Sequence, residues 1–358
     1  MPASQRAFKM GSPDGYDGRT TWLVHNHLNA HEPDFDAVDR DSSLRAILGV
    51  DKNFAYEVLA KEDWIGRRLV ASRLRKGRAF IAGDSAHLWV PYAGYNMNAG
   101  IADACNLAWL LAARIQGWAG EHMLDAYEAE RLPITEQVSR LAMDHAQKVM
   151  SARAAIPSDI EDASPQGEQA RAAVGQRSYA LNVEQFCCAG LNFGCYYTNS
   201  PIILADDEAP PTYTMGSFTP STVPGCRTPH VWLKDGRSLF DAFGPGYTLL
   251  YTRADARPDA LVKAARTAGM PLTVLDLSSV VLPASYRHRF VLCRSDQHVA
   301  WRSDTIPELP DELRAQLCGK ATAGQQRGRT SKCPAHRTGY GGNSMQMAND
   351  YKASSVPR

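Results

Sequence analysis

The chain has 358 residues, of which 44% are hydrophobic and 22% charged, and its formal net charge is +1. This length and apolar content predict roughly two or three domains with packed cores, and they exclude a chain that is disordered throughout. The near-neutral charge argues against a nucleic-acid partner. No apolar run reaches the roughly 18–20 residues that cross a bilayer, and the first residues lack the apolar core of a secretory signal. We therefore expect a soluble cytoplasmic protein that binds neither nucleic acid nor membrane.

The first 80 residues combine strand and helix patterns. Near alternation of β-branched and aromatic residues predicts a strand at 20–28, and short helix and strand signals mix over 44–59. Residues 79–82 form an apolar run after a turn at Gly77, which predicts a buried strand.

Two helices follow a loop that contains Pro91 and Gly94. The first is predicted at 98–116. The second begins near 121 and continues past Pro133 towards Met150, because good helix formers and apolar residues at spacings of three and four persist over this range.

Three blocks complete the chain. Residues 151–215 predict a connector, and the polar stretch at 158–169 is typical of a loop. Residues 216–318 predict a compact α/β domain. Residues 319–358 carry seven Lys/Arg and one acidic residue without hydrophobic periodicity, which predicts a disordered basic tail.

The compact domain of 216–318 contains a regular succession of patterns. A strand at 225–233, a Lys-Asp-Gly turn and a short helix come first, followed by a buried strand near 247–252. An amphipathic helix at 259–269, a strand at 271–277 and a hairpin at 289–304 that turns at Asp296-Gln297 complete the domain.

The eight cysteines form no Cys-x-x-Cys pair and have no zinc-type spacing. Cys187, Cys188 and Cys195 are close in sequence, and Cys333 is near His336, but neither group offers four regular ligands. We therefore expect reduced thiols, no disulfide framework and no metal site.

The candidate chemistry lies in residues 77–117. An apolar strand there would deliver Gly83 and Asp84 to the carboxyl end of a sheet, where α/β proteins bind ligands. Gly83 would let a ligand approach the backbone, and the Asp84 carboxylate suits hydrogen bonds from sugar-like hydroxyls. The amides at the start of the next helix would favour an electron-rich or anionic group. Taken alone, a Gly-Asp pair is very weak evidence for a ligand site and is far more typical of a strand-to-helix turn with an N-capping aspartate.

A longer motif distinguishes these readings. Residues 77–111 read GRAFIAGDSAHLWVPYAGYNMNAGIADACNLAWLL, and residues 125–134 read DAYEAERLPI. This order resembles the second flavin signature, and the element after it, of class A FAD-dependent aromatic-ring monooxygenases, the family of p-hydroxybenzoate hydroxylase and phenol hydroxylase. Residues 225–252 resemble the start of the thioredoxin-like C-terminal domain in the phenol hydroxylase branch. The resemblance runs from about Trp22 to Leu317.

The resemblance implies an α/β (α+β) fold. Residues 1–150 would be the C-terminal half of a p-hydroxybenzoate-hydroxylase-like FAD/substrate domain, 151–215 a connector, and 216–318 a thioredoxin-like domain. It further implies FAD as cofactor, NAD(P)H as reductant, and hydroxylation of a small phenolic or related aromatic substrate through a flavin C4a-hydroperoxide. That chemistry needs no protein nucleophile and no metal, so we predict neither and assign no catalytic residue.

Site residues carry over position by position. Asp84 would bind the ribityl hydroxyls of FAD, Pro91 would lie by the isoalloxazine ring, and the backbone of 94–98 would face its pyrimidine edge, with the helix N-terminus stabilising negative charge on the reduced flavin. The predicted cofactor-binding set is Gly83, Asp84, Pro91, Gly94, Asn96, Met97 and Asn98. We assign capping, packing or salt-bridge roles to Asp103, Asn106, Trp109, Glu130 and Arg131, and no proton-transfer role to His87.

The sequence departs from the family pattern in three respects. No Gly-x-Gly-x-x-Gly segment follows a strand to seat the FAD pyrophosphate, and the glycines near 339 lack that context. Compared with the family, the chain starts within the substrate domain, and the mid-chain Asp-Gly motif is missing. Asn96 stands where the family usually has glycine, and its side chain would crowd the flavin.

Three hypotheses for function remain. The first is the FAD-dependent monooxygenase, and the second is a non-catalytic truncated remnant or interaction protein of the same family. The third, a thiol oxidoreductase, is disfavoured because no Cys-x-x-Cys is present. We expect the third block to contribute to association into a homodimer.

Overall fold

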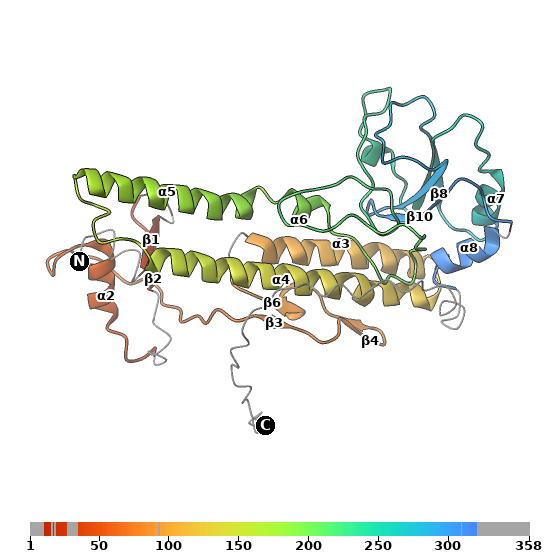
Figure 1. Ribbon diagram of the computed structural model, residues 1–358. Helices are drawn as coiled ribbons and strands as arrows, with labels where there is room; N and C mark the ends of the chain where they lie inside the picture. Colours follow the sequence, from red (N-terminus) through yellow and green to blue (C-terminus); the bar gives the residue numbers. More distant parts are fainter. Residues whose placement is uncertain are drawn as a thin grey trace, which may run out of the picture. The chain divides into compact units, whose positions relative to one another are not determined.

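The computed structural model describes residues 11–15, 17, 19–26, 35–91, 94–308 and 310–320 (Figure 1). The predicted basic tail lies outside these ranges from residue 321 on. So do Cys333, His336 and the glycines near 339.

The N-terminal part contains one strand pair and one helix. Strand β1 (Gly11–Gly15) pairs antiparallel with β2 (Trp22–Asn26), which confirms the strand predicted at 20–28. Helix α2 (Arg40–Leu48) begins after Asp39, whose side chain accepts from the Ser42 amide, and ends at Gly49 in the left-handed conformation.

Four two-residue strands lie around the predicted site. β3 (Leu69–Val70) pairs antiparallel with β6 (His87–Leu88), and β4 (Arg75–Lys76) pairs antiparallel with β5 (Ala79–Phe80). The strand predicted at 79–82 is therefore shorter than expected, and in the described chain it belongs to a hairpin and not to the edge of a parallel sheet. Only β4 supplies a ladder for β5, so regular pairing stops after Phe80.

Two long helices form the scaffold of the first half. Helix α3 (Tyr95–Ile115) is followed by the 3-10 turn η3 (Glu121–Leu124) and by α4 (Asp125–Ala154), which continues through Pro133 as predicted. α3 and α4 pack against each other (Figure 1). None of the helices in the part of the chain that the structure describes is both long and apolar enough to cross a bilayer.

The stretch predicted to be a loop contains a helix. α5 (Pro165–Phe186) runs for 22 residues and contacts α4, and the short α6 (Ala189–Phe193) follows it. The loop predicted at 158–169 is wrong because these polar residues include a helix start. Ser164 accepts a hydrogen bond from the Gly167 amide, and Pro165 occupies the first turn, where its missing N–H has no cost.

The C-terminal part is built on a four-stranded sheet. β7 (Tyr247–Tyr251), α7 (Asp259–Thr267) and β8 (Leu272–Asp276) form a parallel strand–helix–strand unit, and β9 (Phe290–Arg294) and β10 (Val299–Ser303) form the predicted hairpin. The strand order is β10-β9-β7-β8, with β9 antiparallel to β7. Helix α8 (Pro310–Leu317) follows the last strand.

The strand predicted at 225–233 is not formed. Its backbone makes only isolated bridges, between Arg227 and His298 and between Trp232 and Ser238. Pro229 lies between these bridges and has no N–H to donate, which prevents a continuous ladder. The short helix predicted after the turn is present as the 3-10 turn η4 (Leu239–Ala242).

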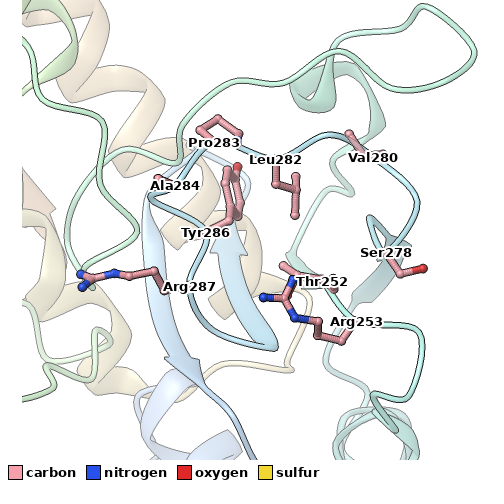
Figure 2. A pocket seen from close by; sticks show the side chains of 9 residues that line it. All are labelled: Thr252, Arg253, Ser278, Val280, Leu282, Pro283, Ala284, Tyr286 and Arg287. Carbon is pink, nitrogen blue, oxygen red and sulfur yellow. Dashed lines mark hydrogen bonds between the residues drawn. The ribbon is translucent and has the colours of Figure 1, made fainter.

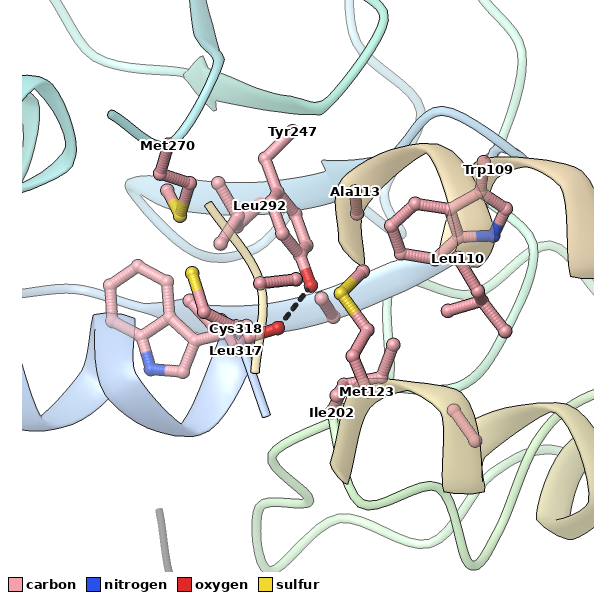
Figure 3. Close-up of a cluster of buried hydrophobic side chains, with 14 of the residues drawn as sticks. Trp109, Leu110, Ala113, Met123, Ile202, Tyr247, Met270, Leu292, Leu317 and Cys318 are labelled. Carbon is pink, nitrogen blue, oxygen red and sulfur yellow. Dashed lines mark hydrogen bonds between the residues drawn. The ribbon is translucent and has the colours of Figure 1, made fainter. Parts of the chain in front are cut away.

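One buried apolar cluster joins the two long helices to the sheet (Figure 3). Trp109 of α3 packs edge-on against Tyr247 of β7, with ring centroids 6.1 Å apart. The Tyr247 hydroxyl donates a 2.8 Å hydrogen bond to the Leu317 carbonyl at the end of α8. These contacts hold the helical part and the sheet together within one compact unit.

The thiols of the C-terminal part should be chemically silent. Cys226, Cys293 and Cys318 are buried and unpaired, and burial raises the pKa of the Cys226 thiol to about 11 and that of Cys293 to about 12. A raised pKa leaves little thiolate at neutral pH. Alkylation of the native chain mapped by mass spectrometry should therefore label the exposed Cys105 and Cys187 before these three, and mild reductant should not shift the thermal melt. Early labelling of Cys226 or Cys293, or a reductant-sensitive melt, would contradict this.

Candidate functional site

The predicted Gly-Asp pair forms the start of a tight turn. Gly83, Asp84 and Ser85 make the 3-10 turn η1 (Gly83–Ser85), and Gly83 has a φ of 56°, which favours glycine. A Cβ atom on Gly100 of α3 would lie 3.2 Å from the Gly83 Cα. The two glycines therefore let the turn and the first part of α3 approach each other at backbone distance.

The N-terminus of α3 lies open beside this turn. Gly94 is the N-cap residue, with a φ of 67° and no side-chain cap, and its amide donates to the Pro91 carbonyl at 3.3 Å. Asn98 donates from Nδ2 to the Gly94 carbonyl at 2.8 Å, which braces the turn. Pro91, Gly94 and Asn98 are exposed, and Met97 is 71% exposed. The first helix amides consequently present partial positive charge at an accessible surface.

Asn96 connects the two parts of the site. Its Nδ2 donates to Asp84 Oδ1 at 2.9 Å, and its Oδ1 lies 3.2 Å from Nδ1 of His87. The Asp84 carboxylate is otherwise exposed. The Asn96 side chain is thus turned onto Asp84 and His87, and the expected crowding of the flavin by Asn96 stays a prediction.

A buried polar network supports the turn from below. His87 Nε2 lies 2.8 Å from Asp103 Oδ2, and the other oxygen of Asp103 accepts from Arg131 Nε at 2.8 Å. Asp103 also accepts from the Gly83 amide at 3.2 Å. Both ring nitrogens of His87 thus face oxygen atoms, one on Asn96 and one on Asp103.

The charge on Asp103 is stabilised within this network. Burial by itself would raise the pKa of the Asp103 carboxyl, but the His87 hydrogen bond and the Arg131 cation outweigh it and hold the pKa below its ordinary value. The carboxylate therefore stays ionised and fixes His87, Arg131 and the Gly83 amide. The salt-bridge roles predicted for Asp103 and Arg131 are confirmed.

The connection of His87 and Asp103 to the site was not predicted from the sequence. Neither residue stood in the predicted cofactor-binding set, yet their hydrogen bonds run from Arg131 through to Asn96 and Asp84. One signal was available: Asp103 lies within the apolar run of a helix, and a buried carboxylate there requires partners.

A second buried network joins α4 to the sheet. Arg294 of β9 contacts both oxygens of Glu130 at 2.5 and 2.8 Å, and it also pairs with Asp296 at 2.6 Å. Asn106 Nδ2 donates to Glu130 at 2.7 Å, and the Trp109 ring lies under the guanidinium at 4.7 Å. The packing and salt-bridge roles predicted for Asn106, Trp109 and Glu130 are thus confirmed.

The residues present fit one end of FAD. The exposed Asp84 carboxylate can accept hydrogen bonds from hydroxyls. The glycines at 83 and 100 place this turn directly against α3, whose N-terminus has no side-chain cap and carries the exposed Gly94, Met97 and Asn98. Within the described ranges no glycine-rich loop follows a strand and opens a helix, and no three His, Cys, Asp or Glu side chains are grouped so as to hold a metal ion.

Two family descriptions match the chain. Residues 4–142 match an FAD binding domain, and residues 221–321 match the C-terminal domain of aromatic-ring hydroxylases. The chain is 32% identical to the FAD-dependent monooxygenase apdD of Emericella nidulans, over 86% of the chain and 52% of the relative. It is 27% identical to phenol 2-monooxygenase of a Pseudomonas species, over 81% of the chain and 53% of the relative.

Solved structures agree with these matches. The rebeccamycin biosynthetic enzyme RebC with reduced flavin superposes with a TM-score of 0.72 at 31% identity, over 86% of the chain and 56% of RebC. Aklavinone-11 hydroxylase in complex with FAD and aklavinone gives a TM-score of 0.60 at 25% identity, over 83% of the chain and 54% of that enzyme.

The chain spans about half the length of the curated relatives it matches. The helical part with its Gly83–Asp84 turn lies in the segment that matches the FAD binding domain, and the four-stranded sheet lies in the segment that matches the hydroxylase C-terminal domain. The sequence motifs, the fold, the two matched segments and the relatives agree. The chain belongs to the family of FAD-dependent aromatic-ring monooxygenases.

Proposed function

We propose that this chain forms the flavin-ring and ribityl side of the FAD site in a monooxygenase that hydroxylates a phenolic or fused-ring aromatic substrate, with NAD(P)H as reductant. The observation that carries the proposal is the open α3 N-terminus beside the exposed carboxylate of Asp84. The substrate class follows from relatives named as phenol, polyketide and aklavinone hydroxylases.

Each predicted site residue has a role in this proposal. Asp84 accepts hydrogen bonds from the ribityl hydroxyls, and Asn96 holds its carboxylate in one orientation. Gly83 allows the cofactor to reach the backbone, and Asn98 keeps the Gly94 turn in place. Pro91 and Met97 contact the isoalloxazine ring through their exposed surfaces.

The α3 N-terminus supplies electrostatic stabilisation. The 21-residue helix has no side-chain cap at its N-terminus, and the partial positive charge of its first amides would stabilise negative charge on a reduced flavin. FAD, when bound, supplies the oxygen-activating chemistry, which this chain's side chains cannot perform. NAD(P)H provides two electrons. Of the two atoms of O₂, one enters the aromatic ring and the other leaves as water.

The sheet of the C-terminal part has a structural role in this proposal. We assign it to the thioredoxin-like class, supported by the order β10-β9-β7-β8 with one parallel pair and one hairpin. Association into a homodimer through this part stays a prediction.

Titration with FAD tests the proposed function. The chain alone should bind FAD weakly, with no saturation at or below the micromolar scale, because the described site contacts only one end of the cofactor. A fusion that joins the chain to the part of the Emericella nidulans relative that it does not match should retain FAD and reduce it with NAD(P)H.

Two controls make this titration decisive. The unmatched part of the relative alone should not reproduce the fusion's affinity for FAD. If the fusion folds, as judged by a cooperative melt, yet retains no FAD, the enzymatic proposal fails and the non-catalytic interaction protein takes its place. Micromolar binding by the chain alone would show that the described site does not depend on further contacts.

A further inference from the structure

The segment between α2 and β3 has the sequence pattern of a strand but no partner. Residues 55–68 belong to no helix or strand, and Figure 1 shows them as a trace that runs from α2 to β3. None of their backbone amides donates a hydrogen bond to any described residue. Apolar or aromatic side chains nevertheless stand at positions 54, 56, 58 and 60, and such alternation is typical of a strand.

This 55–68 segment exposes a contiguous group of apolar side chains. Val58, Leu59, Trp64 and Ile65 are each more than half exposed. Single exposed apolar residues are normal on a protein surface, whereas a group of them on one stretch of chain marks an interaction site. Unpaired amides together with exposed apolar side chains are the features of an edge strand that accepts another strand.

Both ends of the 55–68 segment are held in place. Arg45 of α2 donates to the carbonyl of Phe54 at 3.1 Å, just before the segment begins. At its other end, Arg68 donates from Nε to Ser139 Oγ of α4 at 2.9 Å. The segment is therefore fixed to two helices before any partner binds, and this reduces the entropy that pairing would cost.

The 55–68 segment leads directly to the proposed flavin side. It continues into β3, which pairs with β6, and β6 follows the turn that carries Asp84. A Cβ atom on Gly66 would lie 2.9 Å from Cγ1 of Val90, the residue before Pro91. A partner strand on this segment would consequently lie next to the residues assigned to FAD.

The relatives indicate which partner fits. They are about twice as long as the matched region, and within the described ranges this chain has no glycine-rich loop that could seat the FAD pyrophosphate. A complete FAD site requires that second part beside the first. Its position relative to Asp84 is where the 55–68 segment leaves amides and apolar side chains uncovered.

We propose that the 55–68 segment is the docking strand for the part of an FAD-dependent monooxygenase that this chain does not match. A strand of that part pairs with the free amides and covers Val58, Leu59, Trp64 and Ile65, which places its pyrophosphate-binding loop beside Asp84. The choice of partner rests on the proposed function, since it takes the chain as one side of an FAD site.

Hydrogen–deuterium exchange tests this pairing without relying on FAD. The chain alone is compared with its fusion to the unmatched part of the Emericella nidulans relative. In the chain alone, the amides of 55–67 should exchange as fast as those of an unprotected peptide, and in the fusion about a hundredfold more slowly. The loop at 278–285, whose residues Ser278 to Ala284 appear in Figure 2, should exchange equally in both and is the internal control.

Two matched variants of the fusion test the apolar contact. Val58→Asp should reduce the protection of 55–67 at least about tenfold, because pairing would bury a carboxylate without a partner. Val281→Asp should leave it unchanged, since Val281 is 95% exposed in the C-terminal part. Both valines are exposed in the chain alone, so neither substitution should change its thermal melt.

The outcomes separate this pairing from the proposed function. Fast exchange of 55–67 in a fusion that melts cooperatively would overturn the pairing, even if that fusion retains FAD. Protection of 55–67 in a fusion that retains no FAD would support the pairing and refute the proposed function. Sedimentation of the chain alone tests the other occupant. A dimer that Val58→Asp abolishes would overturn the proposal, because a second copy would then occupy the segment.

Discussion

Replacing Arg294 by methionine should lower the free energy of unfolding by about 3–5 kcal/mol. The Arg294 and Glu130 side chains are both fully buried, and two charge-assisted hydrogen bonds join them. Methionine fills much of the same volume, so the loss comes mainly from charge. Without the Arg294 guanidinium, the carboxyl groups of Glu130 and Asp296 lose their buried cationic partner, which is far costlier than losing an exposed pair.

The surroundings of Arg294 add to this effect. Its guanidinium lies between the rings of Trp109 and Tyr197, at 4.7 and 5.3 Å, and also pairs with Asp296. Burial by itself would lower the pKa of Arg294, but Asp296 and Glu130 outweigh it and raise the pKa above its usual value. The cation is therefore the centre of the contact between α4 and the sheet.

Urea denaturation at pH 7 measures the loss. Arg289→Met is the matched control, because Arg289 pairs with Asp255 while both side chains are largely exposed, and its removal should cost less than about 1 kcal/mol. Adding Glu130→Gln to Arg294→Met should recover part of the stability, since it removes a carboxyl group that has lost its cationic partner. Similar losses for Arg294→Met and Arg289→Met would show that the buried pair does not anchor the sheet.

In the fusion described above, Asp84→Ala should weaken FAD binding about tenfold to a hundredfold, because a carboxylate that accepts hydrogen bonds from hydroxyls contributes on this scale. Asp84 is exposed, and its only side-chain partner among the described residues is Asn96. The substitution should therefore change affinity with little change in stability. FAD dissociation and thermal melts, measured on the same preparations, separate the two.

Two variants control for indirect effects. Asp103→Ala should lower the melting temperature first, because Asp103 is buried and bonded to His87, Arg131 and the Gly83 amide. Asn96→Gly leaves the Asp84 carboxylate in place but frees its orientation, so its effect on affinity should be smaller than that of Asp84→Ala. Equal FAD affinity in wild type and Asp84→Ala would remove Asp84 from the cofactor site.

Helices α3, α4 and α7 and the strands of the C-terminal sheet were largely predictable from the sequence. Apolar residues at spacings of three and four over 98–116 and from 121 towards Met150 correspond to α3 and α4, and the alternation and turns of 247–304 correspond to β7, α7, β8 and the β9–β10 hairpin. These patterns depend on residues close together in the chain, so sequence alone suffices to recognise them.

The connector shows where local patterns mislead. Residues 158–169 are polar enough to predict a loop, yet α5 begins within them, because Ser164 and Pro165 form a helix start whose continuation depends on contacts with α4. The strand predicted at 79–82 is present but shorter than expected, for a related reason. A strand requires a partner, and β5 extends only as far as β4 accompanies it.

The family could be identified from the sequence alone, because the order of residues 77–111 resembles the second flavin signature of FAD-dependent aromatic-ring monooxygenases. Only the tertiary structure decided what these residues contact. Asn96 departs from the family pattern, and three-dimensional proximity turns it onto Asp84 and His87. Glu130 and Arg294 are 164 positions apart, and no local spacing predicts their pairing. Such contacts arise from the packing of α4 against the sheet, and packing depends on the whole chain and not on neighbours in sequence.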